Sequence, residues 1–371
     1  MSSAILYKQI DFFASVWYVC LKCFFNGDCM KVSILGAAGK VGSEVTRLLA
    51  EQTSFSSKID VVLYTPNNVQ KISGQLQDLQ ESLLTLGKSF SNHVSFYPSN
   101  NLTDMKGSNL LVITAGLFAS KEEKEAYKLL DPSGRNIQSF KNAPLVANLC
   151  YEIKKYAPKS SVLVVTNQSD TMSELARSIL GKQKVYGLGC YLDTLRFKKI
   201  FADLAHLSYS DFEATILGFH SKDMFLNDAT FKINKKIKNA EEIKLQAIKH
   251  TISRGKEISD TQKDVHHIEI NSGASKLPAA CIFNIIKAYT QKDYPLTIPL
   301  NRLLEKAEKA LIKGDIPIGV QLPCQISYKK INTLQADLNQ QDINSLRQSL
   351  SSFITELNSF FENIGLLQGL S

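Results

Sequence analysis

The chain has 371 residues, 44% of them hydrophobic and 21% charged, which is the composition of a globular protein with room for two domains. Lys and Arg total 43 against 35 Asp and Glu, yet no dense basic run with interleaved aromatic residues occurs, so we expect no nucleic-acid partner. The seven cysteines are odd in number and irregularly spaced, which argues against a disulfide framework and favours a reducing, cytoplasmic compartment.

Residues 1–29 differ from the rest of the chain. Their apolar stretch, 12–25, is interrupted by Lys22 and is too short to predict a membrane helix, and no small-x-small cleavage site marks a signal peptide. The three cysteines of this segment lack a fourth ligand at metal-site spacing, since the nearest histidine is His93, so we predict no metal site. We expect an extension outside the fold and no membrane partner.

From Met30 onward, predicted strands and helices alternate. Short apolar strands are predicted at Lys31–Leu35, Asp60–Tyr64, Val94–Tyr97, Asn109–Thr114 and Ser161–Thr166. Helices with an apolar face are predicted after Gly42, over Val69–Leu86 and over about 135–157. Strands separated by helices imply a parallel sheet with right-handed crossovers, and continuous apolar strands imply that both faces of this sheet are covered.

Three glycines stand between the first strand and the first helix, in the segment GAAGKVG (36–42). Gly36 permits a tight turn, Gly39 lets the backbone approach a pyrophosphate, and Gly42 lets the helix pack close to the strand. The helix N-terminus offers N–H groups and the positive end of its dipole to the phosphates. A glycine triplet alone is weak evidence, but its place after the first strand of a parallel series favours dinucleotide binding over a purely structural turn.

The end of the second strand bears on the choice between NAD and NADP. A carboxylate at this point usually receives the hydroxyls of the adenosine ribose. Here the strand runs into the neutral segment Thr65–Asn68, and Asp60 lies at the wrong end of it. No Arg is present to bind a 2′-phosphate, and Lys71 is the nearest cation. We predict NAD as the cofactor, with NADP left open.

Four segments resemble the lactate/malate dehydrogenase family. The family's TAG stands at 114–116, its TNPVD appears as TNQSD (166–170), its GLGTxLDxxRF as GLGCYLDTLRF (187–197) and its GEHGDSM as GFHSKDM (218–224). Their order and spacing make the resemblance specific, and it extends over about residues 30–365. It implies an α/β fold, with a Rossmann-type doubly wound parallel sheet over 30–169 and an α+β catalytic domain over 170–371.

The resemblance also implies roles in hydride transfer. His220 corresponds to the catalytic acid/base, since an imidazole with a pKa of roughly 6.5 exchanges protons near neutrality. Asp193 corresponds to the carboxylate that orients this imidazole, and Arg196 to the fork that binds the substrate C1 carboxylate. Asn167 corresponds to a contact with substrate and nicotinamide. A single such residue is more often structural, but three matched roles in the matched order favour function.

The implied cofactor contacts come from the glycine loop, the strand ends and one later helix. They are Gly36, Gly39, Lys40, Val41, Gly42, Thr65, Thr114, Ala115, Gly116, Asn142, Val165 and Asn167. Three positions depart from the family pattern. Phe219 replaces a glutamate, Ser221-Lys222 replaces Gly-Asp, and Gln168 replaces a proline that the family often holds cis, so we expect an altered backbone at Gln168.

The segment after TAG departs most, and it bears on the substrate. In the family an Arg near the start of this loop binds the distal carboxylate of malate, and a last Arg polarises the carbonyl. Counting back without gaps aligns Arg135 with the last Arg, whereas Ala119 stands near the first. Lys121, Lys124 or Lys128 could replace the missing cation, although their Glu-rich helical setting favours a solvated surface.

Two further candidates are weaker. The pair His266-His267 suggests a metal, but adjacent side chains point to different faces, which favours solvent or packing roles. Lys276, in a segment similar to that of malate enzymes, either adds positive charge near the substrate or faces water.

The sequence therefore predicts a nicotinamide-dependent dehydrogenase that acts on a small 2-hydroxy or 2-oxo acid. Malate/oxaloacetate is the first choice, which would place it in the tricarboxylic acid cycle, and lactate or a bulkier monocarboxylate is the alternative. A catalytically silent nucleotide-binding protein of the same fold is the third possibility. The family resemblance implies a homodimer or homotetramer.

Overall fold

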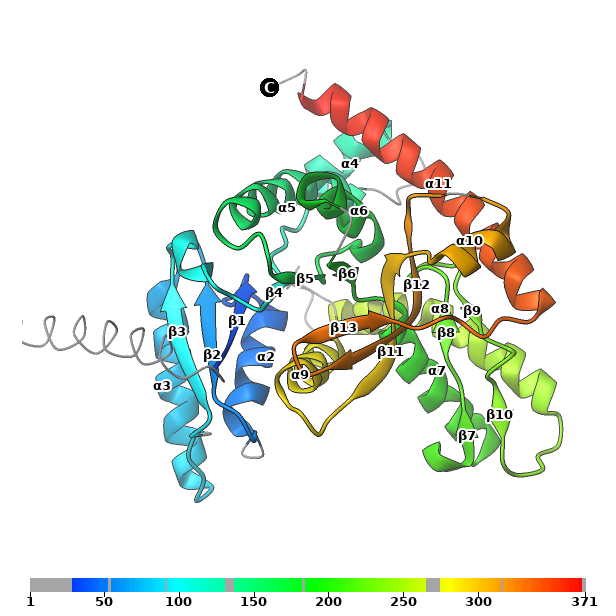
Figure 1. The fold of residues 1–371 in the computed structure, drawn as a ribbon, viewed down its shortest axis with the longest axis horizontal. Helices are drawn as coiled ribbons and strands as arrows, with labels where there is room; N and C mark the ends of the chain where they lie inside the picture. The colour runs from blue at the N-terminus through cyan, green and yellow to red at the C-terminus, as the bar shows by residue number, and fades with distance from the viewer. Residues whose placement is uncertain are drawn as a thin grey trace, which may run out of the picture.

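The computed structural model describes residues 29–52, 55–90, 92–130, 137–181, 184–264, 274–314 and 316–368. Almost all of the predicted extension, as well as Arg135 and the pair His266-His267, lies outside these residues. The described chain is built on one nine-stranded sheet with the strand order β13-β12-β11-β6-β5-β4-β1-β2-β3. Figure 1 shows this sheet running through the centre of the molecule with helices on both sides.

Six parallel strands form one part of the sheet: β1 (Met30–Leu35), β2 (Ile59–Tyr64), β3 (Val94–Ser99), β4 (Leu110–Ile113), β5 (Ser161–Val164) and β6 (Val185–Gly187). The first five agree with the predicted strands to within a few residues. All residues of β4 and β5 are buried, as continuous apolar strands require when a sheet is covered on both faces. The order 3-2-1-4-5-6 is that of a dinucleotide-binding fold, so the parallel, doubly wound sheet is confirmed.

Helices connect these strands: α2 (Lys40–Glu51), α3 (Val69–Thr85), α4 (Lys121–Leu130), α5 (Ile137–Tyr156) and α6 (Ser169–Leu180), with the short η1 (Leu102–Met105) before β4. On one face of the sheet, α2 packs with α9 (Lys276–Thr290) around a core that includes Val32, Leu49 and Ile282. On the other face, α5 and α6 cover a second core with Leu111, Val146 and Met172. Both layers are visible in Figure 1.

The second half of the chain adds the remaining elements. They are α7 (Cys190–Ala205), η2 (Tyr209–Asp211), β7 (Phe212–Glu213), β8 (Ile216–Leu217), β9 (Phe225–Leu226), β10 (Lys232–Ile233), α8 (Ala240–Asp264), β11 (Leu296–Leu303), α10 (Lys306–Ile312), β12 (Gly319–Ser327), β13 (Lys330–Thr333) and α11 (Gln340–Gln368). Strands β11, β12 and β13 are antiparallel and extend the nucleotide-binding sheet beyond β6. The sequence analysis did not predict this, since it separated the halves near residue 169.

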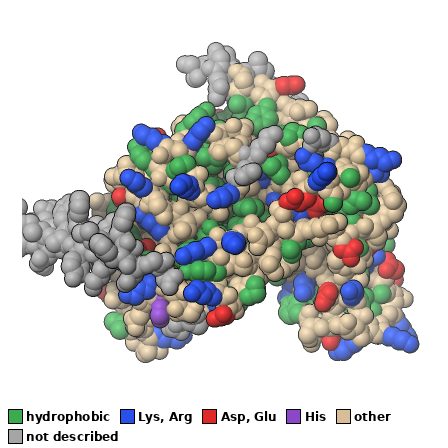
Figure 2. Space-filling model, in the orientation of Figure 1, with side chains coloured by type: hydrophobic (Ala, Val, Ile, Leu, Met, Phe, Trp, Pro, Cys, Tyr) green, Lys and Arg blue, Asp and Glu red, His purple; other side chains and the backbone are tan. Residues whose placement is uncertain are grey.

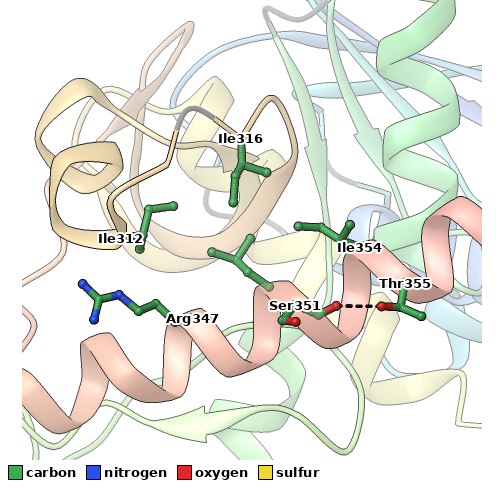
Figure 3. Close-up of a pocket in the computed structure, with 7 residues that line it drawn as sticks. Ile312, Ile316, Arg347, Ser351, Ile354 and Thr355 are labelled. Atoms are coloured by element: carbon green, nitrogen blue, oxygen red, sulfur yellow. Dashed lines mark hydrogen bonds between the residues drawn. The ribbon is translucent and has the colours of Figure 1, made fainter.

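The long C-terminal helix α11 lies along the edge of the molecule, beside α10 (Figure 1). Figure 3 shows a shallow groove between these helices, with an apolar floor that includes Ile312, Ile316 and Ile354. Arg347 closes one end of it and donates a hydrogen bond of 2.7 Å to the carbonyl of Leu311. No helix within the described ranges is both long and apolar enough to span a membrane.

Candidate active site

The loop after β1 is the tightest part of the predicted cofactor site. Gly36 has a φ of +102°, and a Cβ there would lie 2.5 Å from the backbone nitrogen of Ala115. A Cβ on Gly42 would lie 2.5 Å from the carbonyl oxygen of Gly36. Only glycine fits these two positions, because strand β4 and helix α2 both press on the loop. The loops after β1 and β4 thus meet where the strand order reverses, which is where nucleotides bind in such sheets.

Helix α2 begins directly at this loop. Its N-cap is Gly39, its first turn contains no acidic residue, and among the described residues no side chain caps it. Lys40 is exposed at the first turn, and Val41 is half-buried against the core beside it. The first N–H groups of this helix and its positive dipole end therefore suit the phosphates of a dinucleotide.

The end of β2 forms the next part of this surface. Thr65 is buried, and its N–H donates to the carbonyl of Ser99 at 2.9 Å. Lys71, in the first turns of α3, extends across the glycine loop, and its Nζ lies 3.4 Å from the carbonyl oxygen of Ala38. The cation noted in the sequence is therefore next to the phosphate-binding loop.

The ends of β4 and β5 are joined by one buried amide. The side chain of Asn142 accepts the N–H of Leu117 at 2.7 Å and donates to the carbonyl of Asn167 at 2.6 Å. Thr114 anchors the same edge through a 3.1 Å hydrogen bond to the carbonyl of Leu35. The segment that follows β4 is therefore fixed to the segment that follows β5.

These strand ends gather most of the residues expected at the nicotinamide. Gly116 and Asn167 are exposed, and Thr114, Ala115 and Val165 are half-buried.

The peptide between Asn167 and Gln168 is cis. The expected change of backbone at the position of the family's proline is therefore wrong, because glutamine occupies the same conformation. Its side chain accepts a 3.1 Å hydrogen bond from the hydroxyl of Ser139 on α5.

The predicted catalytic residues meet across two elements. Asp193 lies in the first turn of α7 and is fully buried, whereas His220 follows β8. The Nδ1 atom of His220 lies 2.5 Å from one carboxylate oxygen of Asp193, and Nη1 of Arg196 lies 3.1 Å from the other. The imidazole side chain retains 28% exposure. One buried carboxylate thus holds both a histidine ring and an arginine, with the other ring nitrogen left for a ligand.

The environment of His220 sets its protonation. Burial lowers its pKa, but the charge of Asp193 and the hydrogen bond to it oppose this effect. Arg196 lowers the pKa and Asp170 raises it, and the net result is a pKa above the ordinary value of 6.5. The protonated imidazole, which reduction of a 2-oxo acid requires, therefore persists to higher pH than in an ordinary histidine.

Asp170 is a residue of this site to which the sequence analysis gave no role. Its buried carboxylate accepts the backbone N–H of His220 at 2.7 Å and the side-chain amides of Asn301 and Gln321 at 2.7 and 2.8 Å. The amide of Gln321 also accepts the N–H of Cys190 at 3.2 Å. The position of Asp170 in the TNQSD motif was the only signal. The structure links the motif directly to the histidine backbone and, through Asn301 and Gln321, to β11 and β12.

The enlarged segment after β4 is held more loosely. Ala119 is buried, and α4 contacts α5 through an ion pair between Glu123 and Lys141 and through the rings of Tyr127 and Phe140, 5.7 Å apart. Lys124 and Lys128 are exposed, and Lys128 pairs with Glu125 at 2.8 Å.

Lys276 and the possible metal ligands are the remaining candidates from the sequence. Lys276 is 85% exposed and faces Glu44 at 4.0 Å, so it lies beside α2. Within the described ranges, no three His, Cys, Asp or Glu side chains are grouped as metal ligands. In Figure 2, Lys and Arg side chains are spread over the visible face with Asp and Glu among them.

Comparison with known proteins agrees with this geometry. Residues 30–187 match the model of the NAD binding domain of lactate/malate dehydrogenase. Malate dehydrogenase of Methanothermobacter thermautotrophicus is 30% identical over 197 residues, 53% of this chain and 56% of the relative. The chain thus spans little more than half the length of the first curated relatives it matches. L-2-hydroxycarboxylate dehydrogenase (NAD(P)(+)) of Methanocaldococcus jannaschii is 26% identical and covers 86% of this chain and 96% of its own.

Solved structures share the fold. Malate dehydrogenase from Plasmodium falciparum superposes with a TM-score of 0.71 at 20% identity, covering 90% of this chain and 99% of its own. Lactate dehydrogenase from Eimeria maxima, with NADH and oxamate, gives 0.72 at 19% identity, covering 91% and 95%. Residues 30–187 thus match the NAD binding domain of lactate/malate dehydrogenase, and the described chain as a whole shares the fold of these solved structures.

Proposed function

We propose that this protein is a nicotinamide-dependent dehydrogenase that interconverts a small 2-hydroxy acid and its 2-oxo acid. The observation that carries the proposal is the Asp193 carboxylate, which is fully buried and holds His220 with one oxygen and Arg196 with the other. A structural histidine would need no such carboxylate and no neighbouring arginine, whereas proton transfer beside a bound carboxylate needs both.

The residues of the chain have distinct roles in this proposal. In oxidation, neutral His220 accepts the hydroxyl proton of the substrate at Nε2 while Asp193 stabilises the cation that forms. In reduction, the same imidazolium returns the proton to the carbonyl oxygen. NAD, when bound, supplies the hydride acceptor or donor. The glycine loop and the ends of β4 and β5 orient it, since they meet at the same edge of the sheet.

Arg196 is suited to the C1 carboxylate. Its side chain is only 9% exposed, and its Nε is buried with no hydrogen-bond partner among the described residues. A buried N–H of a guanidinium without an acceptor is costly, and a carboxylate ligand would remove that cost. This unsatisfied N–H donor therefore suits an anionic substrate.

Malate/oxaloacetate is the first choice of substrate. Malate dehydrogenases are among the curated relatives and the structural neighbours. A second carboxylate in a closed site needs a second cation, because an unpaired buried charge is heavily penalised. Arg196 neutralises only one, so the other cation would come from the segment 117–136 or from Lys276.

A monocarboxylate such as lactate is the second candidate, and one observation favours it. Ala119 is buried and stands near the position at which the family has the arginine for the distal carboxylate. Lys124 and Lys128 are exposed on α4. These described lysines therefore face solvent, and Lys276 faces Glu44.

Three further features belong to the same proposal. The neutral Thr65–Asn68 segment favours NAD while leaving NADP open. Four buried cysteines of the described chain, Cys150, Cys190, Cys281 and Cys324, are free thiols, which supports a cytoplasmic location. A homodimer or homotetramer is expected from the family.

An assay of NADH oxidation over a panel of 2-oxo acids tests the proposal. We expect turnover with oxaloacetate above that with pyruvate or 2-oxoisocaproate. A preference for a monocarboxylate would replace malate with the second candidate. If the protein binds NADH but turns over none of the 2-oxo acids, the third possibility, a catalytically silent nucleotide-binding protein, would replace both.

A further inference from the structure

Residues 218–224, the histidine loop, have one partner that the catalytic roles do not explain. Side chains of helix α11 that lie more than 120 residues later in the chain contact this loop at both ends. The family pattern places a glutamate before the histidine, but here Phe219 occupies that position. Phe219 and Asp223 are therefore features of this chain that need their own account.

The first contact is a ring stack. Phe219 is 1% exposed, and its ring lies 4.1 Å from that of Phe353 on α11, with 22° between their planes. Phe219 is thus buried against α11, while His220 faces Asp193 on α7. A shift of the Phe219 ring would move the attached backbone of His220.

The second contact is a pair of serine hydroxyls. Ser352 donates to the carboxylate of Asp223 at 2.7 Å, and Ser349 donates to the backbone carbonyl of the same residue. The loop is pressed onto the helix here, since a Cβ on Gly218 would lie 3.0 Å from the hydroxyl of Ser349. Ser349 is almost fully buried, so the loop has little space in which to move.

The other anchors of the loop do not replace this contact. Gly218 pairs with the backbone of Gln321, and Asp170 accepts the N–H of His220. Both fix the entry to the loop and the histidine backbone, and pairing of β9 with β8 resumes at Phe225, whereas Asp223 itself is fixed by α11. From this geometry we infer that Asp223, Ser352 and Phe353 are positioning residues, which hold His220 in register with Asp193. This inference rests on the proposed function only for its effect on turnover.

A shift of the histidine loop would change the contact between Nδ1 of His220 and the carboxylate of Asp193, which lie 2.5 Å apart. The charged groups facing His220 are Asp193 and Arg196 from α7 and Asp170 from α6. If the loop shifts away from α7, the interaction with Asp193 weakens most because it is the direct one. The pKa of His220 then falls toward its ordinary value of 6.5.

The test compares two adjacent serines of α11 in the full-length protein. Ser352→Ala removes the hydrogen bond to Asp223, whereas Ser351→Ala makes the same change on the side that faces the groove in Figure 3. We expect Ser352→Ala to lower kcat for 2-oxo acid reduction about three- to tenfold, with the KM for NADH unchanged. The His220 pKa, read from its imidazole NMR signal and assigned with His220→Asn, should fall.

Further variants separate positioning from general loss of stability. Ser352→Thr should restore both kcat and pKa, and Ser352→Ala combined with Asp223→Ala should be no worse than the poorer single change. Phe353→Leu should lower the pKa in the same direction while the protein still binds NADH.

Equal pKa and turnover in the Ser352→Ala and Ser351→Ala proteins would overturn the inference. The imidazole titration does not depend on turnover. An inactive wild type would therefore contradict the proposed function, and the pKa values of the variants would still test this inference.

Discussion

The catalytic centre and the segment that follows β4 lie at the same edge of the sheet but are held very differently. Asp193 is fully buried, and His220 is fixed by hydrogen bonds from α6 and α7. Among the described side chains, helix α4 rests on α5 through an ion pair and a ring contact, and Lys124, Glu125 and Lys128 are exposed. Proton transfer requires sub-ångström placement, which a rigid core supplies. Substrate choice can change in a loosely held segment without disturbing that core.

The largest effect should come from the centre itself. We expect His220→Asn to lower kcat for 2-oxo acid reduction by about 10²–10⁴, because the proton donor is lost. NADH binding, followed by fluorescence titration, should remain, since the glycine loop is untouched. His206→Asn, at the exposed left-handed C-cap of α7, is the matched control and should keep full turnover. Wild-type turnover in the His220→Asn protein would remove this residue from the mechanism.

The pH dependence should show the same rigid placement. Because the pKa of His220 is raised above 6.5, the midpoint of the pH profile for reduction should lie above that pH. At higher pH, kcat/KM should fall about tenfold per unit as the imidazolium is lost, and oxidation should rise over the same range. Asp193→Asn should move both midpoints to lower pH.

The matched control for that shift is Asp203→Asn, on an exposed turn of the same helix, where Asp203 pairs with Lys199. It should leave both midpoints in place. A midpoint at or below 6.5 in the wild type would contradict the interaction with Asp193 that raises the pKa of His220.

A smaller effect should come from the contact between α4 and α5. Glu123→Gln removes the ion pair with Lys141. We expect the KM of the 2-oxo acid to rise by less than about fivefold with kcat unchanged, because an ion pair this exposed contributes little. Glu125→Gln breaks the pair with Lys128 on the outer side of α4 and should change nothing. A fall in kcat in the Glu123→Gln protein would mean that α4 acts on the catalytic centre.

The smallest effect should appear at the cofactor. We expect kcat/KM for NADH to exceed that for NADPH by less than about 100-fold, since no carboxylate at Thr65–Asn68 repels a 2′-phosphate. Lys71→Ala should lower the efficiency with NADPH more than with NADH, by a few-fold, because Lys71 reaches the glycine loop. Lys88→Ala, at an exposed position after α3, is the control. Strong preference for NADPH would reveal a phosphate-binding group elsewhere.

The local pattern of the sequence determined the nucleotide-binding half. The resemblance of their motifs to a known family predicted the roles of His220, Asp193 and Arg196, whereas apolar runs and the glycine motif predicted five parallel strands. These features are encoded locally, because a buried strand needs its own apolar residues and a tight turn needs its own glycine.

The tertiary structure decided what joins distant segments. It brings Asp170 to the backbone of His220 and Gln321 to Asp170, adds β11–β13 to the same sheet and stacks Phe353 on Phe219. Each of these contacts connects residues far apart in the chain, and none leaves a periodic or spacing signal. The polar group that a buried N–H finds, or the ring that covers another ring, depends on packing of the whole fold.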